Sequence, residues 1–192
     1  MKELHELRFI HKKIKIREHT KKLFSDIKNT IMWYNKSAFK ARHIDLWLIY
    51  MMGLLEGLSF SDTKEMSDRF IFRRSDRTRL LSYSRHSKKA LKKLSLRNII
   101  ASSVYNTLEP LSFEEVLFLR ARTKIKKIHY RIEEFLARHN RVRIKIGGEE
   151  LKKLGVKPGP LYAEILKKVL HEKIDGKIKT KNDEINFVKR SL

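Results

Sequence analysis

The side chains that most often carry catalysis or bind metals are dispersed in this sequence. There is no cysteine, which excludes disulfides and thiolate metal sites. None of the eight histidines forms a pair at metal-ligand spacing together with a third ligand. His43 and Asp45 do not make the adjacent His-Asp doublet of metal phosphohydrolases, and the aspartates show no acid–base pair pattern. We therefore predict no catalytic residue, no metal site and no cofactor in this chain.

Lysine and arginine are the residues whose number and spacing do indicate a chemistry, the binding of phosphate. The chain has 45 Lys and Arg against 22 Asp and Glu, a net charge of +23. Residues 73–97 hold ten cations and one acid, and residues 120–145 hold ten cations and two acids. One sign of charge dominates both stretches, which favours a polyanion-binding surface over an ordinary solvated helix face. The RNA-binding residues predicted here are Arg73, Arg74, Arg77, Arg85, Lys88, Lys89, Lys124, Lys127, Arg131, Arg138, Arg141 and Arg143.

So large a charge opposes folding by self-repulsion and calls for a polyanionic partner. Nucleic acid is the usual partner of such a basic chain, and an anionic membrane surface is the rival. The longest apolar run, near residues 46–58, is interrupted by Gly53, Glu56 and Gly57 and is too short to span a bilayer. The first residues are polar and charged, without a signal-peptide pattern. We therefore expect no membrane partner and, by elimination, a cytoplasmic location.

The distribution of helix-breaking residues predicts an all-α fold. The three prolines lie at 110 and beyond, and no glycine occurs from residue 58 to residue 146. Apolar residues recur at spacings of three and four, and Asp62–Glu65 and Ser112–Glu115 resemble capping boxes. Expected helices cover residues 21–34, 44–57, 62–70, 75–94, 99–108, 113–120 and 124–139. A helical protein without strands reads structured RNA by its shape and 2′-hydroxyls rather than by base sequence.

The last of these helices has two neighbouring stripes. The apolar stripe consists of Ile125, Ile128, Ile132, Phe135 and Leu136. Lys124, Lys127, Arg131 and Arg138 lie about a quarter turn away by the helical period. Basic residues that border a packing seam could bind a phosphate backbone in the groove between two helices.

A cluster of glycines and prolines punctuates the C-terminal segment, which we expect to be a compact unit of three helices. Gly155 is suited to end a helix in the left-handed conformation. Pro158-Gly159 favours a tight turn, and Pro160 suits the first position of the next helix. The free amides of that helix start, next to Lys157, could bind an anion. A plain helix–turn–helix connection explains the local pattern equally well, and Asp175-Gly176 is interpreted as a turn.

This segment resembles the tail of the bacterial class II tRNA nucleotidyltransferases, the family of CCA-adding, A-adding and related poly(A) polymerase enzymes. The matching motif runs without a break from Ile146 to Pro160 and is followed by Ile165-Leu166 and Asp175-Gly176. Two departures are Glu150, where the family has Asp, and Ala163, where a glycine is common. Upstream segments are also similar to the helical body of that family, namely Trp33-Tyr34, Trp47–Tyr50, Leu54–Leu58 and Tyr105–Leu111.

The resemblance implies a multi-helix body followed by a small helical tail, which hold the acceptor arm and elbow of tRNA while a separate head domain adds nucleotides to the 3′ end. It divides the chain into a neck-like segment 1–42, an RNA-binding body 43–145 and a tail 146–192. By match of motif, it also places Lys157, Gly159 and Pro160 near the RNA backbone.

The catalytic head that the resemblance implies has no counterpart in this sequence. That head needs a Gly-Ser turn and paired aspartates for two metal ions, and the chain has neither Gly-Ser nor Asp-x-Asp. Magnesium and ATP or CTP are therefore expected only at an absent head. Three origins fit: the C-terminal piece of a split enzyme with a separately encoded head chain, an excised fragment, or a free RNA-binding relative. The alternatives are a non-enzymatic assembly subunit that binds a protein partner, and an autonomous nucleotidyltransferase with a cryptic site.

Overall fold

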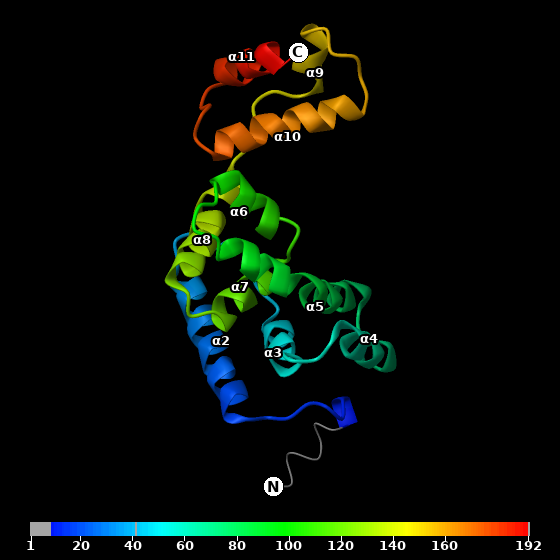
Figure 1. Cartoon of the computed structure of the whole chain (residues 1–192). Coiled ribbons are helices and arrows are strands. Elements are labelled where there is room, and N and C mark those ends of the chain that lie inside the picture. The colour runs from blue at the N-terminus through cyan, green and yellow to red at the C-terminus, as the bar shows by residue number, and fades with distance from the viewer. Residues whose placement is uncertain (1–8, 41, 192) are drawn as a thin grey trace. The chain divides into compact units, whose positions relative to one another are not determined.

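The computed structural model describes residues 9–40 and 42–191. Its regular secondary structure is all helical, with no strand among those residues. Residues 1–8, 41 and 192, which include the ends of the predicted segments 1–42 and 146–192, lie outside the described residues. The helices, shown in Figure 1, are α2 (Glu18–Lys36), α3 (Leu46–Leu54), α4 (Phe60–Arg69), α5 (Arg74–Leu94), α6 (Ala101–Leu108), α7 (Phe113–Arg122), α8 (Lys126–Ala137), the short 3₁₀ helix η1 (His139–Arg141), α9 (Gly148–Lys153), α10 (Pro160–Ile174) and α11 (Lys181–Ser191). The predicted all-α class, with a helical body and a small helical tail, is confirmed.

The chain consists of two compact units. The first contains the residues up to Arg97 together with Thr107–Glu133, and the second contains Asn98–Asn106 and the residues from Glu134 onward. The division into 1–42, 43–145 and 146–192 stays a prediction. No helix in the described part of the chain combines the length and apolar character needed to cross a membrane.

The core of the first unit forms around α7, which packs against α2, α3 and α5. Four consecutive α7 residues, Val116 to Leu119, are all buried. A helix that is apolar on every side is stable only where neighbours cover it all round. Tyr34 of α2, Leu48 of α3 and Leu80 of α5 are among the fully buried side chains of this unit. This core fixes which face of α5 points inward.

Capping residues set the helix starts in the first unit. The predicted capping box of Ser112 and Glu115 is confirmed at the start of α7. The box predicted for Asp62 and Glu65 is wrong by one turn, since Ser59 is the N-cap of α4 and exchanges hydrogen bonds with Asp62. The helix expected from Lys124 begins later, because the Thr123 hydroxyl accepts the Ile125 N–H at 3.2 Å.

The second unit contains the predicted three-helix tail, α9 to α11. Its core consists of Ile146, Leu151, Val156, Ile165, Val169, Ile178 and Val188. Gly155 and Gly176 have φ of +83° and +77° and follow the ends of α9 and α10. Each is the glycine of a Schellman cap, in which the glycine amide and the amide of the following residue donate to carbonyls of the last turn. The predictions of a cap at Gly155 and a turn at Asp175-Gly176 are confirmed.

Candidate nucleic-acid interface

The α5 helix separates its cations from its core residues by face. Asp76, Leu80, Tyr83, Ser87, Ala90 and Leu94 face inward at spacings of three and four. The same period turns Arg74, Arg85, Lys88, Lys89 and Lys92 outward, and all five are exposed. We call these five residues the α5 basic face. It includes four of the predicted residues and adds Lys92, which the helical spacing from Lys88 and Lys89 could have identified.

The other predicted cations near α5 are placed differently. Arg73 is exposed at the N-cap position of the helix. Arg77 forms an ion pair with Asp68, so part of its charge is already neutralised. The Arg85 guanidinium lies 4.5 Å from the centre of the Phe60 ring, a contact that orients the side chain without neutralising it.

Arg79 belongs to the same cationic stretch but points inward and binds three acids. Its guanidinium lies 2.7 Å from Asp45, 2.5 Å from Asp76 and 3.1 Å from the buried carboxylate of Glu114. Burial lowers the pKa of Arg79, but the hydrogen bonds with Asp45 and Asp76 and the charge of Glu114 outweigh it and raise that pKa. Arg79 therefore holds α3, α5 and α7 together and is not available to an RNA.

The predicted cations before and within α8 differ in whether they already have partners within the protein. Lys127 is exposed, whereas Lys124 forms an ion pair with Asp26 of α2. Arg131 donates hydrogen bonds to the carbonyls of Leu94 at 2.6 Å, Leu96 at 2.8 Å and Arg97 at 3.2 Å. A guanidinium at this end of α5 satisfies carbonyls that lack helical partners and compensates the negative end of the helix dipole. Of the three, Arg131 is thus the most firmly committed to the fold.

The predicted cations of the second unit follow one another along the chain. Arg138 pairs with Glu134, Arg141 is exposed, and Arg143 donates to the carbonyls of Asn140 and Val142. The next residues are anchored because Lys145 and Ile146 donate their amides to the fully buried carboxylate of Glu184. This anchor, formed by residues nearly forty positions apart, could not be found from local sequence.

Lys157, Gly159 and Pro160 are brought together at the start of α10. All three are exposed, Gly159 is the N-cap, and Pro160 takes the first helical position as predicted. Because the first amides of a helix lack carbonyl partners, this corner carries partial positive charge next to Lys157. The arrangement is compatible with the predicted phosphate contact.

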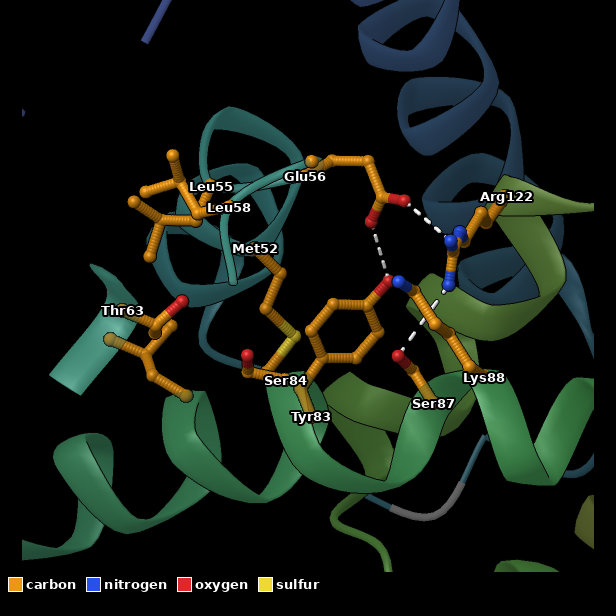
Figure 2. Close-up of a pocket in the computed structure, with 12 residues that line it drawn as sticks. Met52, Leu55, Glu56, Leu58, Thr63, Tyr83, Ser84, Ser87, Lys88 and Arg122 are labelled. Atoms are coloured by element: carbon orange, nitrogen blue, oxygen red, sulfur yellow. Dashed lines mark hydrogen bonds and ion pairs between the residues drawn. The ribbon is translucent and has the colours of Figure 1, made fainter. Parts of the chain in front are cut away.

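A pocket of about 180 Å³ in the first unit contains a closed polar network (Figure 2). The Glu56 carboxylate accepts the Tyr83 hydroxyl at 2.7 Å and pairs with Arg122 at 2.6 Å. Burial, and then the charge of Glu56, raises the pKa of Tyr83, so the phenol stays protonated and donates to the carboxylate. Glu56 is therefore charge-compensated and offers no free general base.

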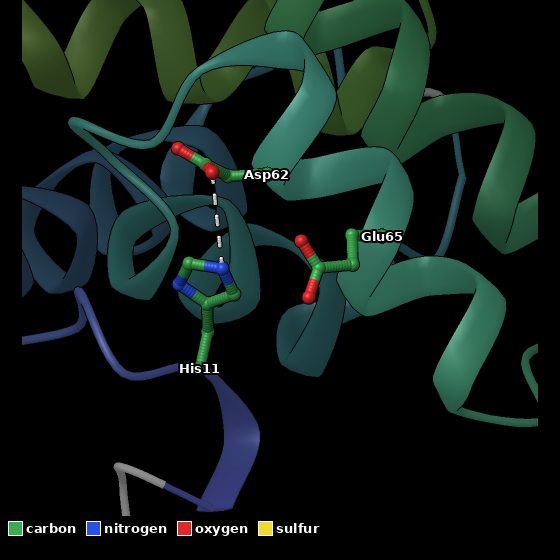
Figure 3. A group of neighbouring side chains, drawn as sticks. All are labelled: His11, Asp62 and Glu65. Atoms are coloured by element: carbon green, nitrogen blue, oxygen red, sulfur yellow. Dashed lines mark ion pairs between the residues drawn. The ribbon is translucent and has the colours of Figure 1, made fainter.

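One group of possible metal ligands, His11, Asp62 and Glu65, was missed by sequence reasoning because His11 lies far from the others in the chain (Figure 3). Two of its members, His11 and Asp62, already have partners. Lys13 pairs with Asp62 at 2.8 Å, and Nδ1 of His11 accepts the Lys13 amide at 3.3 Å. In the neutral ring this leaves the proton on Nε2, which lies 3.9 Å from Asp62. A metal would need the lone pair of Nε2, so the group is better suited to fasten the N-terminal segment to α4.

The contacts of Asp62 predict that its contribution to the stability of the folded state depends on pH. Hydrogen bonds from Lys13 and Ser59 lower the pKa of Asp62 from 3.8 to about 2. A carboxyl with a lowered pKa in the folded state stabilises that state fully above its unfolded pKa. We therefore expect the contribution of Asp62 to be complete above pH 3.8 and lost as the pH falls through about 2. A carboxyl-carbon NMR titration measures this pKa, and Lys13→Ala should move it toward 3.8. An unchanged pKa in that variant would contradict the pairing.

No model of a protein family matches the chain. The A-adding tRNA nucleotidyltransferase of Geobacter sulfurreducens is 25% identical over 189 residues, which cover 96% of this chain. This chain resembles a part of a tRNA nucleotidyltransferase. The resemblance inferred from the tail motif is thereby confirmed, and it extends over nearly the whole chain. The chain spans only 21% of the length of that relative.

Solved structures show the same fold. The Thermotoga maritima CCA-adding enzyme complexed with tRNA is 22% identical, with a TM-score of 0.74 over 95% of this chain and 44% of its own. A CCA-adding enzyme in its apo form II is 24% identical, with a TM-score of 0.73 over 95% of this chain and 42% of its own. The chain therefore has the fold of less than half of each of these enzymes.

Proposed function

We propose that this chain is the body and tail of a tRNA nucleotidyltransferase and holds tRNA by its sugar-phosphate backbone. The observation that carries the proposal is the alignment of 96% of the chain with an A-adding enzyme. The basic surfaces support it, because exposed cations on rigid helices bind phosphates of any sequence. The Thermotoga maritima enzyme was solved in complex with tRNA, which gives the partner class for that relative.

The proposed contacts are the α5 basic face with Arg73, the exposed Lys127, and in the second unit Arg138, Arg141, Arg143 and the Lys157–Pro160 corner. Arg77, Lys124 and Arg131 contribute less, since each already has a partner within the protein, and the ion pair with Glu134 reduces the contribution of Arg138 in the same way. Nucleotide addition, with its magnesium and its ATP or CTP, belongs to a head domain, supplied either by a separate chain or by the rest of a longer one. We place the protein in the cytoplasm with its tRNA partner.

The test is a tRNA titration at several salt concentrations. If about six phosphates are neutralised, affinity should fall roughly a thousandfold between about 50 and 200 mM salt. The chain alone should add no nucleotide, and a head domain with the Gly-Ser and paired-aspartate signature should restore addition when mixed with it. Absence of tRNA binding at low salt would refute the proposal. Incorporation of labelled ATP by the chain alone would instead reveal an active site within it.

A further inference from the structure

A row of four aromatic side chains lies where the N-terminal segment, α3 and the α4–α5 connection meet in the first unit. The Phe9 and Phe70 rings are 6.2 Å apart, Phe70 and Phe72 are 6.1 Å apart, and Phe72 and Trp47 are 6.1 Å apart. The last two rings are nearly parallel, with 8° between their planes. Residues from three separate parts of the sequence thus form one continuous aromatic surface, which we call the aromatic row.

Much of this row is open to solvent. Phe9 is 73% exposed, Trp47 is 44% exposed, and Ile71, between the two inner phenylalanines, is fully exposed. Single exposed apolar residues are ordinary, but several in one place mark a surface that binds something. The core of the unit does not need these groups, because α2, α3, α5 and α7 already cover one another.

The charge beside the row indicates what it binds. Arg69, Arg73 and Arg74 are exposed on either side of Phe70 and Phe72 in the sequence. Arg69 also donates to the carbonyl of Phe9 at 3.3 Å, which holds that residue against the end of α4. The acids that flank these arginines in the sequence are paired, Asp68 with Lys64 and Arg77, and Asp76 with Arg79. Glu65, one turn before Arg69, lies beside His11. The partner should therefore combine flat apolar faces with negative charge.

Unpaired nucleotides have that combination of groups. Their bases stack on aromatic rings and their phosphates bind arginine, whereas a duplex hides its base faces within its own stack. We propose that the aromatic row is a binding site for single-stranded RNA. It shares Arg73 and Arg74 with the contacts proposed for the backbone of folded tRNA, whereas its four rings are not among those contacts. It rests on exposed rings and not on the likeness to nucleotidyltransferases, so either proposal can fail without the other.

Trp47 supplies a direct readout, because the chain has only two tryptophans. In a Trp33→Phe background, Trp47 is the single tryptophan of the 192-residue chain. A ten-nucleotide oligoadenylate should quench its emission by stacking, and a blunt-ended RNA duplex, which has no unpaired nucleotide, should leave it nearly unchanged. Quenching of equal size by both RNAs would overturn the proposal.

Affinity measurements on variants complete the test. Phe9→Ala and Trp47→Ala should each weaken oligoadenylate binding about 5- to 100-fold, and Trp47→Phe should retain most of it. Met32→Ala is the matched control, since Met32 is 46% exposed on α2 of the same unit, and it should have no effect. Phe9 is exposed enough for its truncation to leave the fold intact, which circular dichroism checks.

The failing outcomes are distinct. Unchanged oligoadenylate affinity in both truncations would overturn the single-strand site. If the same truncations instead weakened binding of a catalytic head domain, the row would be a protein-docking surface, which also overturns the proposal. Absence of tRNA binding by the unsubstituted chain at low salt would refute the proposed function. The oligoadenylate result would remain valid.

Discussion

Reversing Lys88, Lys89 and Lys92 to glutamate together is expected to weaken tRNA binding on the order of 100-fold at about 0.1 M salt. The three lysines are exposed on the α5 basic face, so their removal costs phosphate contacts rather than packing. Each lost contact should also reduce the slope of log affinity against log salt by about one. Filter binding or fluorescence anisotropy at four salt concentrations gives both quantities.

The control variant changes the net charge by the same amount, by reversing three lysines at other positions. Lys22, Lys28 and Lys40 are also exposed, in and just after α2, and are not among the proposed contacts. Their reversal should weaken binding far less, and equal losses in the two triple variants would show that total charge, not the α5 basic face, governs affinity. Arg131 is unsuitable for such a test, because its reversal would also remove the cap of α5.

Glu184→Ala should lower the free energy of unfolding of the tail by about 3–5 kcal/mol, the range for breaking a buried ion pair from one side. Glu184 is fully buried, pairs with Lys173 and accepts the amides of Lys145 and Ile146. Its loss leaves a largely buried ammonium and two amides without partners. Urea unfolding measures the free energy, and amide exchange at residues 145 and 146 should accelerate.

Two further variants separate the causes of that loss. Glu172→Ala removes a more exposed ion pair, with Lys177, from the same region and should cost much less. Replacing Lys173 and Glu184 together by leucine should recover part of the stability, since no charge is then stranded. A stable Glu184→Ala tail with unchanged exchange rates would show that the buried carboxylate does not anchor the segment.

Most of the fold could be predicted from the sequence because its signals are local. Helix periodicity, the Ser112–Glu115 capping box and Gly155 each depend on residues within one or two turns of one another. The error in the predicted start of α4 also has a local cause. The sequence pattern predicts Asp62 as an N-cap, whereas Asp62 completes a box begun at Ser59, since both positions carry side chains able to cap.

The candidate site was predictable only in part, because counting charges does not tell which way they point. The α5 basic face follows from helical period once the core face is known. Arg79 and Arg131 lie in the same cationic stretches, yet one binds three acids and the other caps a helix. The Leu94 carbonyl that Arg131 caps is 37 residues away in sequence, so no local pattern reveals it.

The sequence alone determined the helical class, the helix ends marked by glycine and serine, the excess of positive charge and the likeness to tRNA nucleotidyltransferases. Only the tertiary structure decided which cations lack an acid partner, that the Asp175 carboxylate accepts hydrogen bonds from the amide and hydroxyl of Ser102, and that aromatic rings from three separate parts of the sequence form one row. The physical reason is the range of the forces involved. Backbone conformation depends on near neighbours, whereas ion pairs and ring contacts depend on where the packed core places residues that are remote in the chain.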